Sequence, residues 1–491
     1  MNAICLFLVV LIPCAGGILV PLVPWKKRSH MMVYLEGLVI LNSIFVWTLL
    51  FHRPAEIFSL VDFTGNLTIA FQLDGLGTVF AGLVSFLWPL ATLYAFEYMT
   101  KERHEKMFFM FYTITYGVTL GISLAENFLT MYCFYELLTL VTLPLVMHTM
   151  TREAILASRK YLYYSIGGAA FAFIGMIFVI TYGDSISFVL GGVMNPAKLA
   201  DGKNLFLLIY VFSFFGFGVK AAVCPFNSWL PQAGVAPTPV TALLHAVAVV
   251  KSGAFAIMRL TFYCFGTEFL RGTWAQYLLM AVVMFTIVYG CSMAVKETHL
   301  KRRLAYSTIS NLSYILFGVL IMTPPGLVGA LSHMVFHAFM KICSFFCAGA
   351  IMHQSERHYI HQLDGFARKM PKVFAIFTVS AFALMGVPGL CGFISKWNLA
   401  MAAVGSGNIL SYFGVAALLL SALLTAIYML GIVVRAYFPG ADFDYETIAD
   451  VKDPNWKMLL PLFVFAVAIV GFGLCSEPFT ELFLAVAHGS F

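Results

Sequence analysis

The sequence has few charged residues and lacks the motifs of a soluble enzyme. Only 11% of its 491 residues are Asp, Glu, Lys or Arg, whereas soluble domains carry about 25%. With 61% hydrophobic residues, the chain has too little polar surface to cover a water-soluble core, which excludes a soluble fold. No phosphate-binding loop for nucleotides and no haem motif occurs. A reaction that releases free energy, such as nucleotide hydrolysis or electron transfer, must therefore take place in another protein.

Metal-binding cysteine patterns are also missing. The ten cysteines stand mostly alone in apolar runs, and the closest pair, Cys343 and Cys347, does not form a CxxC motif. This spacing indicates no iron–sulfur cluster, zinc site or disulfide, and it is typical of buried small side chains. We therefore expect no catalytic residue, cofactor or metal ion in this chain.

What the sequence does have is long apolar runs of roughly 20 residues, the length of helix that crosses a bilayer. Barrel strands would alternate in shorter segments, so these continuous runs predict helices. The first run has no basic residue before it, and we interpret it as a span rather than a signal peptide. The fold class is an all-α polytopic membrane protein with about 14 transmembrane helices. The expected spans are 3–24, 31–51, 74–98, 107–124, 128–149, 161–182, 205–230, 238–262, 274–295, 304–322, 327–353, 373–402, 409–434 and 457–477.

Lysine and arginine are distributed unevenly between the predicted loops. Loops after odd-numbered spans hold most of the 29 basic residues, whereas loops after even-numbered spans hold only Arg53, Lys198, Lys203 and Arg271. Because cytoplasmic loops concentrate positive charge, this pattern predicts an even number of spans with both termini outside a bacterial or archaeal cytoplasmic (inner) membrane. The net charge of +6 follows from topology and does not indicate a nucleic-acid partner.

Four lysines fall deep inside predicted spans: Lys220, Lys251, Lys341 and Lys396. Each opposes insertion by roughly 2.5 to 3.5 kcal/mol, so a compensating role is expected. Arg259 lies near a helix end, where we expect it to extend outward to the membrane surface.

Glu136 is the deepest acid, and we pair it with Lys220. The pair is either a lock between helices or a coupled site. Burial disfavours a charged lysine and a nearby carboxylate favours it, so their separation would switch proton binding. Pro225 follows Lys220 closely, and MGVPGLCGFISKW contains Lys396. These patterns indicate discontinuous seventh and twelfth helices lining a transport site, or simple proline kinks.

His333, His337 and Lys341 recur every four residues in LSHMVFHAFMK, and therefore lie on one helical face. Each step rises about 6 Å, which suits a water-bridged proton relay. A two-histidine metal site is the alternative, but no third ligand is evident on that face. His245 and Lys251 are six residues apart, which is not a same-face spacing, so we assign them to the route separately.

At these residues the chain resembles the antiporter-like subunits shared by respiratory complex I, Mrp-type sodium/proton antiporters and membrane-bound group 4 hydrogenases. The motifs are FYELLTL, a lysine before PxxxWLP, ALLHA, LKRRLAYSTIS, HxxxHxxxK and GFISK. The residues of VVKSGAF are similar to the D-type Mrp antiporter protein and to the hydrogenase type. The chain departs from the family pattern at Tyr135 (often Trp), Asn227 (often His) and Gln232 (often an acid).

The resemblance implies two inverted five-helix repeats, 107–262 and 274–434, between an N-terminal part, 1–106, and a C-terminal helix in 435–491. It also implies a role for each buried residue in proton transfer. Glu136 and Lys220 form the coupling pair of the first half-channel, and His245 and Lys251 form the step toward the middle of the protein. His333, His337 and Lys341 belong to the second half-channel, and Lys396 is the group from which the proton leaves.

The implied function is translocation of protons, or sodium/proton exchange, by a subunit that is not catalytic alone. Its partners would be other membrane subunits of a dehydrogenase, hydrogenase or antiporter complex, together with membrane lipid. A stand-alone solute transporter and a structural subunit with an inactive channel remain the alternatives.

Overall fold

The computed structural model describes residues 3–64, 67–195 and 202–490, which are mostly helical. The α-helices are α1 (Ile4–Leu22), α2 (Arg28–His52), α3 (Gly75–Tyr98), α4 (Glu105–Ser123), α5 (Phe128–Val146), α6 (Arg152–Tyr182), α8 (Lys203–Gly218), α9 (Trp229–Gln232), α10 (Thr238–Ala246), α11 (Val249–Met258), α12 (Thr267–Leu270), α13 (Trp274–Lys296), α14 (Leu300–Leu320), α15 (Pro324–Ser355), α16 (Phe366–Lys369), α17 (Pro371–Met385), α18 (Cys391–Gly405), α19 (Ile409–Tyr437), α20 (Trp456–Leu474) and α21 (Glu477–His488). Short 3₁₀ turns are η1 (Met99–Lys101), η3 (Ala233–Val235), η5 (Ile360–Gln362) and η6 (Tyr445–Ile448), and η4 (Arg259–Phe265) is a π-helical segment.

A polytopic membrane fold is confirmed. Among the described residues, ten helical segments are long and apolar enough to cross a bilayer: α1, α2, α3 with η1, α5, α6, α10 through η4, α13, α15, α19 and α20. The other four expected spans correspond to α4, α14 and the two broken helices, α8 with α9 and α17 with α18.

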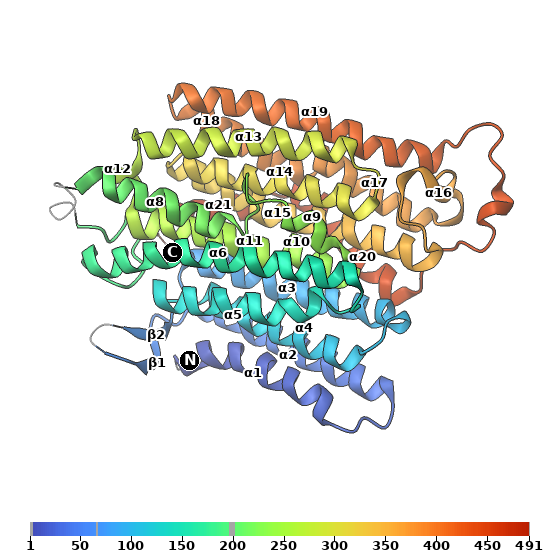
Figure 1. The fold of residues 1–491 in the computed structure, drawn as a ribbon, viewed down its shortest axis with the longest axis horizontal. Coiled ribbons are helices and arrows are strands. Elements are labelled where there is room, and N and C mark those ends of the chain that lie inside the picture. The colour runs from blue at the N-terminus through green and yellow to red at the C-terminus, as the bar shows by residue number, and fades with distance from the viewer. Residues whose placement is uncertain (1–2, 65–66, 196–201, 491) are drawn as a thin grey trace.

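The long helices run side by side along the horizontal axis of Figure 1, and both labelled termini lie at the same end. The opposite end carries α16 and the loop after α19. These segments contain basic residues that were expected on one side of the membrane, including Arg368, Lys369 and Lys452. We call these ends the plain face, with the termini, and the basic face. An even number of crossings follows from this arrangement. Lys198, one of the few basic residues expected on the plain face, lies outside the described residues.

Several predicted boundaries are wrong. Helix α6 begins at Arg152 rather than near 161, and α14 begins at Leu300, so that Lys301 and Arg303 are buried helical residues instead of loop residues. Long basic side chains can cover apolar surface and donate to carbonyls, so their charge does not end a helix. The hairpin of β1 (Phe58–Asp62) and β2 (Thr68–Phe71), and helix α21, were not predicted.

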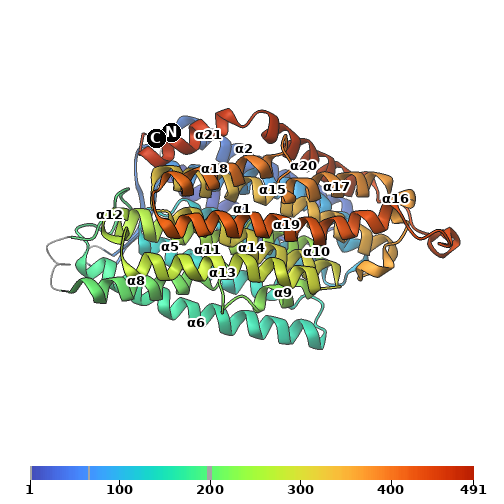
Figure 2. The same cartoon turned by 90° about the horizontal axis from the view of Figure 1, so that it is seen from above.

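Helix α15 is the centre of the bundle. It packs against α3, α10, α14, α17, α18, α20 and α21, and its apolar core segment is wholly buried. Figure 2 shows α15 among α17, α18 and α20. The Thr323 hydroxyl caps it by accepting from Gly326 N at 3.2 Å, and Pro324 occupies the first turn, where no backbone donor is needed. Its histidines and lysine are therefore enclosed by protein rather than by lipid.

Both predicted helix interruptions are present. Helix α8 ends at Gly218, and an irregular stretch with Pro225 precedes α9. Helix α17 ends at Met385, and the residue after it, Gly386, has a φ of 93°, a left-handed conformation that glycine adopts without strain. A third interruption, between Ala246 and Val249, was not predicted, since no proline or glycine marks it.

Candidate functional site

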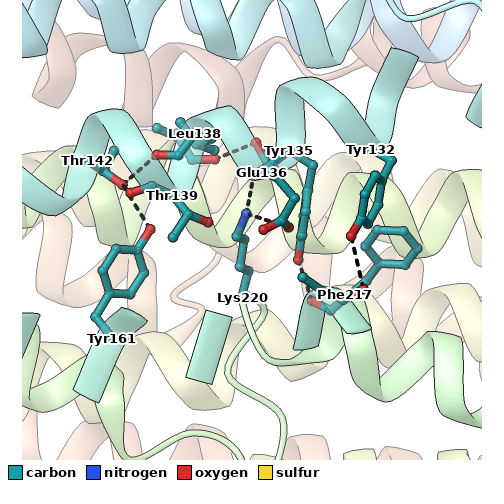
Figure 3. Close-up of polar contacts among 12 residues, drawn as sticks. Tyr132, Tyr135, Glu136, Leu138, Thr139, Thr142, Tyr161, Phe217 and Lys220 are labelled. Atoms are coloured by element: carbon teal, nitrogen blue, oxygen red, sulfur yellow. Dashed lines mark hydrogen bonds and ion pairs between the residues drawn. The ribbon is translucent and has the colours of Figure 1, made fainter. Parts of the chain in front are cut away.

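The first predicted pair is present in the structure. The Asn127 side chain caps α5 by accepting from Thr130 N at 2.8 Å. Two turns later Glu136 faces Lys220, which lies in the irregular stretch after α8 (Figure 3). Lys220 Nζ is 3.8 Å from Glu136 Oε1, and the lysine side chain is 1% exposed. Glu136 is 26% exposed, so the two charges of this pair are hydrated unequally.

Tyr135 provides the remaining contacts of Lys220. The ammonium donates to the Tyr135 carbonyl and lies 3.4 Å from the centre of its ring. The Tyr135 hydroxyl donates to the Phe217 carbonyl at 3.2 Å, which fixes the ring against α8. A cation over an aromatic face is stabilised without a countercharge. Tyr135 stands where the family often has tryptophan, so an aromatic ring is retained at this position.

Lys251 and His337 are in direct contact, although they lie on different helices. Lys251 Nζ is 2.7 Å from His337 Nδ1, and both side chains are fully buried. Helix α11 also approaches the Lys220 backbone at Gly253, where an added Cβ would lie 3.0 Å from the Lys220 carbonyl carbon and 2.6 Å from Ala221 N. Glycine at this position brings the segment that carries Lys251 next to Lys220.

His333 lies one turn from His337, and their rings stack with centroids 5.5 Å apart. Its two nitrogens have separate partners: Nδ1 is 2.9 Å from the Ser395 hydroxyl, and Nε2 is 3.2 Å from the Asn311 side-chain oxygen. We call His333 and His337 the histidine row. Ser395 immediately precedes Lys396, so the histidine row reaches the second broken helix. Ser395 and Asn311 were missed, because no local pattern distinguishes them from other polar residues.

Lys396 closes the end of a half-helix. Its Nζ donates to the carbonyls of Leu384 at 2.6 Å and Met385 at 3.0 Å, the last residues of α17. A helix C-terminus carries unpaired carbonyls and partial negative charge, so it stabilises an ammonium there. The interruption of the helix thus creates the cation site.

Lys341 and His245 are buried but less connected. Lys341 Nζ donates to the Leu304 carbonyl on α14 at 3.1 Å. The His245 ring lies 4.9 Å from that of Phe345, and neither of its nitrogens has a hydrogen-bond partner among the described residues. These two residues lie inside the protein as expected, but among the described residues no side-chain hydrogen bond or ion pair joins them to the other site residues.

The expectation for Arg259 was wrong. Its side chain is 1% exposed, and it forms a two-bond ion pair with Asp74, the N-cap of α3. Its Nη2 donates to Asp74 Oδ1 at 2.7 Å. The π-helical segment beginning at Arg259 turns this side chain inward, and sequence periodicity cannot show such a change in helical pitch.

A polar cavity of about 500 Å³ opens on the basic face. Glu153, His299, Lys301 and Arg302 are among its lining residues. Burial, followed by the nearby charges of Lys301 and Arg302, lowers the pKa of His299 to about 4. Lys301 Nζ donates to the Ala236 carbonyl at 2.9 Å, so the cavity extends to the turn that precedes α10. Within the described residues, no three His, Cys, Asp or Glu side chains are grouped as a metal site requires.

Known proteins that are similar to this chain identify its family. A family model described as NADH:quinone oxidoreductase/Mrp antiporter, TM, matches residues 125–425. NAD(P)H-quinone oxidoreductase chain 4-3 of Nostoc sp. is 28% identical over 447 residues, covering 88% of this chain and 77% of that protein.

Two solved structures share the fold. A chain of the archaeal membrane-bound sulfane sulfur reductase has a TM-score of 0.85 at 22% identity, covering 99% of this chain and 97% of that one. A chain of the Mrp complex from Dietzia sp. has a TM-score of 0.85 at 21% identity, covering 100% and 98%. The predicted resemblance is confirmed: this chain belongs to the NADH:quinone oxidoreductase/Mrp antiporter family of polytopic, antiporter-like membrane subunits.

Proposed function

We propose that this subunit moves protons across the membrane, within a multi-subunit complex, along a row of ionisable side chains. The row comprises Glu136, Lys220, His245, Lys251, His333, His337, Lys341 and Lys396. The observation that carries the proposal is the 2.7 Å contact between Lys251 and His337, because it joins the two proposed repeats, 107–262 and 274–434, inside the membrane. Burying a lysine in a membrane protein costs free energy, so a functional role is expected for it. The contact between Lys251 and His337 provides one, because a proton can pass between the two side chains.

The Glu136–Lys220 pair acts as the switch in this proposal. When the carboxylate is close, it stabilises the ammonium form of Lys220, and when it moves away, the buried ammonium is disfavoured and releases its proton. Lys220 lies in non-helical backbone, which can shift without breaking a regular helix. A neighbouring subunit that moves Glu136 would therefore drive a proton toward Lys251.

Access is proposed at both ends of the row. Protons enter from the cavity that contains His299 and Lys301 on the basic face, and leave past Lys396 at the break between α17 and α18. Buried polar atoms that have no hydrogen-bond partner in the part of the chain that the structure describes, including both His245 nitrogens, are positions where water can complete the path. The basic face is proposed to be cytoplasmic, with both termini outside a bacterial or archaeal inner membrane.

Partner subunits must release the energy, since moving one charge against 100 mV requires roughly 2.3 kcal/mol. Sodium could replace one of the exchanged protons. A dehydrogenase, a hydrogenase or an opposing ion gradient could supply the drive. Solute uptake by the purified chain alone would instead favour a stand-alone transporter.

The test is Lys220→Met in the intact complex, with proton movement into membrane vesicles followed by a pH-sensitive dye. We expect translocation to be lost while assembly is retained, because methionine has a similar shape but cannot carry a proton. Lys106→Met, which removes an exposed lysine on the basic face, is the matched control. Normal translocation by an assembled Lys220→Met complex would show that the channel of this subunit is inactive.

A further inference from the structure

A second buried polar cluster lies between α13, α14 and α19, outside the row described above. Its six members form the hydroxyl cluster, and each is at most 1% exposed: Cys291, Ser307, Ser310, Ser421, Thr425 and Tyr428. The Ser307 hydroxyl lies 2.6 Å from that of Tyr428, which donates its own hydrogen to Thr425 at 3.2 Å and therefore accepts from Ser307. Polar groups at membrane depth are costly unless they are paired or functional, so this concentration requires an explanation.

One end of the cluster reaches the basic face. Tyr428 lines a cavity of about 290 Å³ together with Thr298, Arg303, His361 and Arg435, among others. The Arg303 guanidinium donates to the Tyr428 carbonyl at 3.0 Å, which holds this part of α19 against α14. Tyr428 lies about two and a half turns, or about 13 Å along the helix axis, from the basic end of α19.

The other end reaches the histidine row. Asn311, one turn beyond Ser307 on α14, donates from its amide nitrogen to the Ser307 carbonyl at 2.8 Å. Its side-chain oxygen therefore faces His333 Nε2, 3.2 Å away. Because an amide oxygen can only accept, Nε2 carries the hydrogen in the neutral ring and Nδ1 is the free acceptor, facing Ser395.

We propose that the line from Tyr428 through Ser307 and Asn311 to His333 is a branch that exchanges protons between the basic face and the second repeat. A proton that arrives at Nδ1 from Ser395 makes the ring cationic, and the Nε2 proton then leaves, so the ring is neutral again with its hydrogen on Nδ1. Rotation of the ring, or return of a proton along the branch, restores the hydrogen to Nε2 before the next transfer. Because Asn311 contacts the Ser307 carbonyl rather than its hydroxyl, a bridging water must carry the departing Nε2 proton to the Ser307 hydroxyl. Each hydroxyl releases its own proton as it accepts another, so no phenolate forms. Asn311 is a positioning residue that sets the orientation of the His333 ring.

This inference rests on the proposed function, and its test must separate the two. Tyr428→Phe retains the ring and removes only the hydroxyl. In vesicles that contain the intact Tyr428→Phe complex, we expect the rate of proton translocation to fall about tenfold. Loss of one ordinary hydrogen bond from the rate-limiting step lowers the rate by about that factor. Ser307→Ala should have a similar effect and provides a second measurement if the tyrosine variant fails to assemble.

Ser421→Ala is the matched control. Its hydroxyl is buried in the same cluster, 3.1 Å from Ser310 Oγ and 2.9 Å from Cys291 Sγ, but it lies off the proposed line. Normal translocation by assembled Tyr428→Phe and Ser307→Ala complexes would overturn the branch, and so would an equal loss in Ser421→Ala, which would show that the cluster only holds the helices together. If Lys220→Met abolishes translocation and Tyr428→Phe does not alter it, the branch fails and the proposed function stands.

Discussion

Replacing Glu136 by glutamine is the most informative perturbation of the proposed switch. The side chain keeps its size and loses only its charge, 3.8 Å from Lys220 Nζ. At an effective dielectric constant of about 20, two unit charges at this distance attract by about 4 kcal/mol. Because Glu136 is 26% exposed and therefore partly screened, we expect about half of that, about 2 kcal/mol, or a factor of about 30.

The assay is proton translocation by the intact complex in membrane vesicles at a fixed driving reaction. Glu136→Gln should lower the rate about 30-fold, because the attraction that draws a proton to Lys220 is lost. Glu56→Gln, which neutralises an exposed acid on the plain face, should leave the rate unchanged. Glu136→Asp should lie between Glu136→Gln and the unsubstituted complex, since it keeps the charge but draws it back from Lys220.

The opposite interpretation, a pair that only locks α5 to the stretch after α8, makes a different prediction. Loss of one partner from a buried ion pair destabilises by about 3 to 5 kcal/mol, so the assembled complex would unfold at a clearly lower temperature. If Glu136→Gln lowers the unfolding temperature but leaves proton translocation intact, the proposal that the Glu136–Lys220 pair is a switch is refuted.

Two further outcomes follow from the contacts of other residues. Asp74→Asn leaves the buried Arg259 guanidinium without its countercharge, and should destabilise the complex by about 2 to 4 kcal/mol after allowance for the partial exposure of Asp74; thermal unfolding checks this, and an unchanged unfolding temperature would contradict it. His299 has a folded-state pKa of about 4, against an ordinary value of 6.5, because of burial and the charges of Lys301 and Arg302. Its contribution to stability is therefore complete above pH about 6.5 and is lost as the pH falls toward 4, so His299→Gln should flatten the pH dependence of thermal unfolding in that range.

The parts of the fold that could be predicted are those set by local composition. Runs of apolar residues determine where helices cross the membrane, because an unpaired backbone group in lipid costs several kcal/mol. Pro225 and the segment MGVPGLCGFISKW indicated two helix interruptions, since proline removes a backbone donor and glycine permits a left-handed turn. The buried lysines and histidines could also be identified, because their charge contradicts the apolar surroundings in the sequence.

What could not be predicted depends on contacts between distant residues or on the backbone. Asp74 and Arg259 are 185 residues apart, and neither position suggests the other. The Tyr135 carbonyl that accepts from Lys220 is a backbone atom, so no residue type indicates it. The interruption after His245 lies in a run of alanine and valine, where no proline or glycine indicates a break.

The partners of the four buried lysines differ in a way that bears on the direction of transfer. Among the described residues, Lys220 alone has a carboxylate within ion-pair distance, whereas Lys251 contacts a histidine, and Lys341 and Lys396 donate to backbone carbonyls. A carboxylate next to every lysine would hold each ammonium in place, because breaking a buried ion pair costs several kcal/mol. Carbonyl dipoles and imidazole solvate an ammonium and remain compatible with the neutral amine. In the proposed mechanism, a single acid at the start of the row therefore decides when a proton is held and when it moves on, while the remaining lysines pass it forward without trapping it.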